Sequence, residues 1–244
     1  MRKITLAVFT IAIMACLVNT GNAQNVNDLM NRAEHIGRGG GGLSKEDISA
    51  GLREALRQGA RNATAKVSAV DGFFGNQLIK VLMPEEAKKV ETTLRRVGMG
   101  DKVDKLILSM NRAAEDASTK ALDIFVNAIR DMSIEDGLKI LQGKDDAATQ
   151  YLKAKTTEAL KLAFRPVIKE SLDKVHATEY WADVFNVYNA LPTTFKKVNP
   201  DLPSYVTERA LNGVFVYIAE EEAKIRKDPA ARATDLLRKV FGSN

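Results

Sequence analysis

Three polar residues in one predicted helix have the types and spacing that acid–base chemistry requires. Asn111 and Glu115 lie one helical turn apart on the edge of an apolar face, and Arg112 stands beside them, one turn before Asp116. A carboxylate beside an apolar core can have a raised pKa and act as a general acid or base. The cluster Asn111, Arg112 and Glu115 is therefore a candidate site for a carboxylate-dependent hydrolase.

The same cluster also fits a purely structural role. Asn111 and Glu115 could bond to loops or cap another helix, while Arg112 and Asp116 form a solvated pair. Hydrolysis of a glycosidic bond would need a second carboxylate about 5–9 Å from Glu115, and spacing along the chain does not identify one. We therefore name no catalytic residue.

Other catalytic and cofactor chemistries lack their usual residues. His35 and His176 are the only histidines, and no Gly-x-Ser-x-Gly motif is present, so serine catalysis and a histidine metal site are not expected. The run Gly37–Gly42 is not followed by Gly-Lys-Ser/Thr, so it does not predict a phosphate-binding loop. The sequence predicts no metal and no cofactor.

Aromatic and acidic residues give two further candidates. If several aromatic side chains converge on a cavity, they could line a site for a lipid or another apolar ligand; otherwise they belong to the core. The residues proposed for such a lining are Phe73, Phe74, Tyr180 and Trp181. The run Glu220–Glu222 predicts a solvated helix face with i,i+4 pairs from Glu220 to Lys224 and from Glu222 to Arg226.

The first residues of the chain have the pattern of an export signal. A basic pair (Arg2, Lys3) precedes an apolar run and the small residues Gly21 and Ala23. We expect cleavage after Ala23, which makes 1–23 a signal peptide and leaves a periplasmic protein. In the alternative, Cys16 is acylated and the protein is a membrane-anchored lipoprotein.

The charge of the chain limits the classes of partner that it can bind. The formal net charge is +5, and basic and acidic residues alternate along the chain, so no basic stripe is available for nucleic acid. We expect no nucleic-acid partner and contact with a membrane only through a lipid anchor at Cys16. The expected partners are an envelope protein or an apolar ligand.

The elements that must position these residues are helical. Only 6% of residues are aromatic, and apolar residues recur at helical spacing. We expect one all-α domain of about eight helices over 44–244, preceded by a flexible glycine-rich tether over 24–43. The expected helices cover 44 to about 67–70, 85–97, 101–132, 133–143, a helix capped by Asp145 or Asp146 that continues to 175 with a kink or break at Pro166, 180–191, 204–226 and a last one after Asp228.

Several ordered blocks of the chain resemble one protein family. They include Asp71-Gly72-Phe73, Met110 to Glu115, Gly143 with Ala147-Ala148-Thr149, Ala210 to Gly213, Glu221-Glu222 and Ile225-Arg226. Together these blocks resemble the exported bacterial family named domain of unknown function 4197. The resemblance implies an exported, mostly helical protein of Gram-negative bacteria, and it implies no activity.

The function predicted from the sequence is therefore a broad class. Because nucleophile, metal and cofactor motifs are missing, a non-enzymatic periplasmic binding or interaction protein is favoured. The alternatives are a carboxylate-dependent hydrolase centred on Glu115 and a carrier of a lipid or other apolar ligand.

Overall fold

The computed structural model of the chain describes residues 44–190, 192 and 196–228. The chain divides into two units, Met1–Ser44 and Lys45–Asn244, and all described residues but Ser44 belong to the second. The predicted signal peptide, the glycine tether, Cys16, His35 and the helix expected after Asp228 lie outside the described residues.

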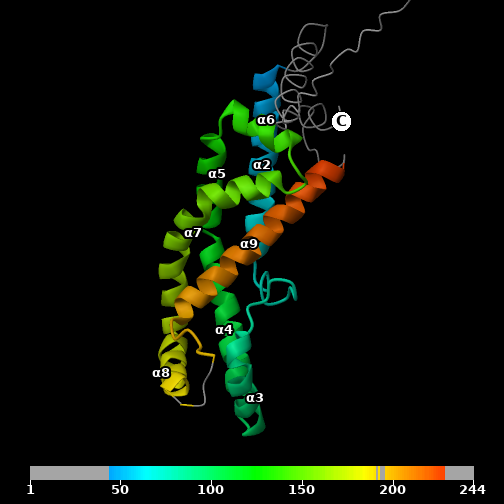
Figure 1. Ribbon diagram of the computed structural model, residues 1–244. Helices are drawn as coiled ribbons and strands as arrows, with labels where there is room; N and C mark the ends of the chain where they lie inside the picture. The colour runs from blue at the N-terminus through cyan, green and yellow to red at the C-terminus, as the bar shows by residue number, and fades with distance from the viewer. Residues whose placement is uncertain (1–43, 191, 193–195, 229–244) are drawn as a thin grey trace, which may run out of the picture. The chain divides into compact units, whose positions relative to one another are not determined.

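The described residues form helices joined by short connections, and no strand occurs among them (Figure 1). The predicted all-α fold is confirmed. In chain order the elements are α2 (Lys45–Ser68), the 3-10 turn η1 (Glu85–Ala87), α3 (Lys88–Arg96), α4 (Gly100–Ser118), α5 (Ala121–Arg130), α6 (Ile134–Gln142), α7 (Ala147–Asp173), α8 (Ala177–Ala190) and α9 (Leu202–Lys227).

Two helices begin at side chains that satisfy their first backbone N–H groups. Before α6, Ser133 Oγ accepts a hydrogen bond from the backbone N–H of Asp136 at 3.0 Å, and the Asp136 carboxylate accepts one from Ser133 N–H at 3.2 Å. Before α9, Asp201 accepts from Ser204 N–H at 3.1 Å. Such caps offset the unsatisfied donors of a helix start.

The prediction of one helix over 101–132 is wrong, because the chain breaks between α4 and α5. Ser118 Oγ donates to the carbonyl oxygen of Ala114, and Thr119 Oγ1 donates to that of Asp116, both at 2.7 Å. Such hydroxyl bonds to the preceding turn weaken a helix only slightly, and the same bond from Thr156 does not end α7. The apolar periodicity continues across the break, since Ala117 and Ala121 are both fully buried.

Pro166 does not break its helix, since α7 continues through it to Asp173. Asp146 occupies the N-cap position of α7, but its side chain makes no capping hydrogen bond. The caps for that helix come from α9, as described below.

The core of this unit lies where α2, α4, α7 and α9 pack together, with α9 crossing the other three (Figure 1). Phe125 and Phe215 meet edge to face with ring centroids 5.9 Å apart. Helices α5 and α6 pack on α2 and α7, whereas α3 packs on α4 and α8 packs on α7 and α9. None of the described helices is long and apolar enough to cross a membrane.

Candidate functional site

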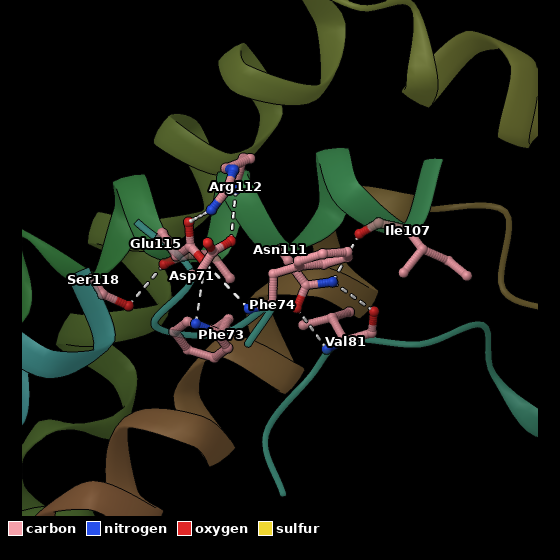
Figure 2. A network of polar contacts seen from close by, with 10 residues as sticks. Asp71, Phe73, Phe74, Val81, Ile107, Asn111, Arg112, Glu115 and Ser118 are labelled. Carbon is pink, nitrogen blue, oxygen red and sulfur yellow. Dashed lines mark hydrogen bonds and ion pairs between the residues drawn. The ribbon is translucent and has the colours of Figure 1, made fainter. Parts of the chain in front are cut away.

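The Glu115 carboxylate is buried and holds a loop in place (Figure 2). Its Oε1 atom accepts hydrogen bonds from the backbone N–H groups of Phe73 at 3.1 Å and Phe74 at 3.2 Å. Its Oε2 atom lies 2.6 Å from Nη1 of Arg112. Both oxygens are thus engaged within the protein.

Arg112 joins the carboxylate to the start of the same loop. Its Nη2 atom lies 2.8 Å from Oδ1 of Asp71, a residue in the left-handed region with φ of 64°. Hydrogen bonds to Glu115 first and to Asp71 second raise the pKa of the Arg112 guanidinium. The expected Arg112–Asp116 pair does not form; Asp116 instead accepts a hydrogen bond from Ser171 Oγ at 3.0 Å.

Asn111 fastens the next stretch of chain to α4. Its side chain accepts from the backbone N–H of Val81 at 2.9 Å and donates to the Val81 carbonyl oxygen at 2.8 Å and to that of Ile107 at 2.7 Å. These contacts, visible in Figure 2, replace the ladder that a neighbouring strand would supply. The cluster of Asn111, Arg112 and Glu115 therefore positions the connection between α2 and η1, and its geometry gives no support to a hydrolase centred on Glu115.

The four candidate aromatic residues divide into two pairs. Phe73 is fully buried against α9, where a Cβ atom at Gly213 would come within 2.9 Å of its Cζ atom. Phe74 lies beside it with Lys80 Nζ 3.7 Å from its ring centroid. Tyr180 and Trp181 line the groove described below, and Phe73 and Phe74 do not.

Glu221 and Glu222 form a second acidic cluster, which is buried although the sequence predicted a solvated helix face. Glu221 on α9 is 5% exposed and accepts hydrogen bonds from Lys224 Nζ at 2.7 Å, Lys66 Nζ at 2.8 Å and Asn62 Nδ2 at 3.0 Å. Burial is the largest single influence and raises the pKa of Glu221, but these hydrogen bonds outweigh it and lower the pKa to about 2. The predicted Glu220–Lys224 pair is replaced by Glu221–Lys224.

The neighbouring Glu222 provides the missing cap of α7. Its carboxylate accepts from the backbone N–H groups of Ala148 at 3.0 Å and Thr149 at 2.8 Å, and from Thr149 Oγ1 at 2.7 Å. The predicted Glu222–Arg226 pair is confirmed at 2.9 Å. Arg226 also donates to the carbonyl oxygen of Ile140 at 2.8 Å, so this pair joins the end of α6 to the start of α7. The predicted solvated face is wrong for Glu221 and Glu222.

An open groove of about 600 Å³ lies between α3 and α4 on one side and α8 on the other. Figure 1 shows α3 and α8 at the same end of the helical unit. The lining is apolar except for Lys102, Lys105, Ser109 and the Tyr180 hydroxyl; the remaining lining residues are Met83, Val90, Leu94, Met99, Val103, Leu106, Leu108, Val175, Ala177, Trp181, Val184 and Phe185.

The α8 wall of the groove is aromatic, and Tyr205 and Asn199 contact its Trp181 side chain. The Trp181 ring lies 4.4 Å from that of Phe185 and 6.3 Å from that of Tyr205, centroid to centroid. Its indole N–H donates to the carbonyl oxygen of Asn199 at 2.9 Å. Trp181 is 2% exposed and Tyr180 is 65% exposed, so the first forms the floor of the groove and the second its edge.

The walls of the groove correspond to apolar stripes in the sequence of α4 and α8. Along α8 the lining positions are 177, 180, 181, 184 and 185, and along α4 they include 102, 103, 106 and 109. Both sets are stripes at helical spacing. A stripe alone does not show whether another helix covers it, and for that reason the groove was not predicted.

In the described part of the chain, no three His, Cys, Asp or Glu side chains lie close enough together to bind a metal ion. His176 is exposed, and its Nδ1 atom lies 3.5 Å from Glu179 on the first turn of α8.

Comparison with known proteins gives one match. The model of a family described as a protein of unknown function (DUF4197) matches residues 42–242. No curated protein and no solved structure matches the chain. The match agrees with the ordered blocks noted above, which meet in space in two clusters: around Glu115 and around Glu222. The chain belongs to the DUF4197 family, whose function is unknown.

Proposed function

We propose that this protein is a non-enzymatic binding protein of the cell envelope that holds a small apolar or amphipathic molecule in the groove between α4 and α8. The observation that carries the proposal is the groove itself, about 600 Å³ in volume with almost entirely apolar walls. Small-molecule sites range over roughly 300–1,000 Å³ and are mostly apolar with few polar groups. The envelope location is supported by the export-signal pattern of the first residues.

The exposure of the walls argues for an occupant. Val175, Val184 and Tyr180 are 51%, 42% and 65% exposed, and all three line the groove. Adjoining apolar side chains left open to water mark binding surfaces more often than scattered ones do. Since no residue of α3 is buried, this wall can also adjust to a ligand at small cost in packing.

The test uses the neutral fluorescent probe N-phenyl-1-naphthylamine and the only tryptophan of the chain, which lines the groove. We expect probe fluorescence to rise on binding while energy transfer quenches Trp181. A V184D variant places a charge in the groove and should weaken probe binding by about tenfold, because burying an unpaired carboxylate is unfavourable.

The matched control is V216D, which changes a valine of similar exposure on α9 that does not line the groove. It should bind the probe like the wild type. Absence of probe binding, or equal loss in both variants, would contradict the proposed function.

A further inference from the structure

We propose that the ligand is a long-chain fatty acid, with its carboxylate at Lys102 and Lys105 and its alkyl chain along the apolar floor beside Trp181. This inference rests on the proposed function and names the ligand class of the same groove.

The charges of the lining select an anion. Lys102 and Lys105 are the charged residues among those that line the groove, and no acidic residue is found there. They lie one turn apart on α4, both exposed, and neither forms an ion pair with another described residue. Two cations with no local partner favour a ligand that carries negative charge.

The acids of the same helix do not cancel this charge. Asp104 Oδ1 lies 2.7 Å from Nη2 of Arg95, which in turn reaches Glu91, so its charge is already paired. Asp101 does not line the groove. Lys102 also lies in the first turn of α4, where the helix dipole favours an anion.

The remaining polar groups of the lining favour a ligand whose chain carries no polar atoms. Ser109 Oγ already donates to the carbonyl oxygen of Lys105 at 2.8 Å, and the Trp181 indole N–H donates to Asn199. The Tyr180 hydroxyl lies at the exposed edge of the groove, so a ligand with ester or hydroxyl groups along its length would bury those groups on the floor without partners, which is unfavourable. A fatty acid has no polar atom beyond its carboxylate, so it suits this lining better than a glycerophospholipid.

The experiment titrates the full-length mature protein with oleate, oleyl alcohol and 1-oleoyl-lysophosphatidate below their aggregation concentrations, with Trp181 fluorescence as the readout. The variant K102Q/K105Q is compared with K120Q/K153Q, which removes two exposed lysines outside the groove and has the same change of charge. Because exposed ion pairs are weak, we expect a loss of about 3- to 10-fold in oleate affinity for K102Q/K105Q only. Added salt should reduce the wild-type affinity towards that of the variant.

Oleyl alcohol separates this inference from the proposed function. It should bind the wild type and both variants alike, which also shows that the variants retain the groove. If oleyl alcohol binds and oleate has the same affinity for all three proteins, the head-group assignment is overturned while the groove function stands. If neither binds the wild type, both proposals fail. Tighter binding of lysophosphatidate than of oleate would replace the fatty acid by a phospholipid.

Discussion

Asn111 and Glu115 show what buried polar side chains do when regular secondary structure is absent. The connection from α2 to η1 pairs with no strand, yet part of its backbone is buried, and a buried backbone group without a partner is costly. Glu115 accepts from two adjacent N–H groups, and Asn111 bonds both to the N–H and to the carbonyl oxygen of Val81. The two side chains thus satisfy backbone groups that a neighbouring strand would otherwise pair with.

This role predicts a large effect of a small change at Glu115. In Glu115→Gln the amide NH₂ would face either the Arg112 guanidinium or the loop N–H groups, so donors would meet donors. We expect the free energy of unfolding to fall by about 2–3 kcal/mol, because charge-assisted hydrogen bonds are lost in a buried site. Urea denaturation followed by circular dichroism measures it. The control Asp116→Asn, at the exposed neighbour, should change stability by less than about 0.5 kcal/mol.

Glu221 predicts a dependence of stability on acid pH. Its pKa in the folded protein is about 2, against a usual value of 4.5. The unfolded chain therefore binds this proton at higher pH than the folded chain does, and the stability that Glu221 contributes is lost as pH falls from about 4.5 to about 2. In Glu221→Gln this part of the pH dependence should disappear, whereas Glu220→Gln should retain it. Thermal unfolding across this range decides between them, and equal profiles for the two variants would contradict the assignment.

At the scale of elements, helix junctions depend on side chains from distant helices. The start of α7 is capped by Glu222 of α9 rather than by Asp146, and Arg226 carries the contact on to the end of α6. A carboxylate at a helix N-terminus also interacts favourably with the helix dipole. One turn of α9 thereby fixes the angle between two other helices.

The helices that could be predicted are those whose ends and faces are determined by residues close to them in the sequence. The Ser133 capping box of α6 and the apolar faces of α2 and α9 arise from neighbouring residues, and the sequence predicted those three helices within a few positions. The break after Ser118 was missed because the apolar pattern continues across it, with Ala117 and Ala121 both fully buried. Pro166 was expected to kink or break α7; the helix does not end there, and Phe164 and Ile168 on either side of it are fully buried.

At the scale of the whole molecule, the candidate site was the least predictable part. The sequence identified Glu115 and Trp181 as residues to examine, but their surroundings come from segments distant along the chain. Spacing rules relate a residue to its own helix, so they predicted Glu222–Arg226 and missed the Lys66–Glu221 contact between α2 and α9. A groove is a face that remains uncovered, which only the packing of all helices determines.

The two ends of this helical unit should differ in stability. No residue of α3 is buried, and α8 packs mainly on α7 and α9, whereas α2, α4 and α7 all pack extensively on α9 in the core. Local opening is cheapest where few apolar contacts are lost. Amide hydrogen exchange followed by mass spectrometry should therefore show α3 and α8 exchanging faster than the core helices.

Binding should remove much of that difference, because a ligand that binds the native groove stabilises the state in which its walls are closed. At a free ligand concentration 100 times the dissociation constant, the stabilisation is about 2.7 kcal/mol. Oleate should then slow exchange in α3 and in the first turns of α4 and α8, and leave α5 and α6 unchanged. In V184D a tenfold weaker affinity lowers the stabilisation at the same concentration to about 1.4 kcal/mol, so the slowing should be smaller. Slowing spread evenly over all helices would place the ligand elsewhere, since only the groove brings α3 and α8 into contact with one molecule.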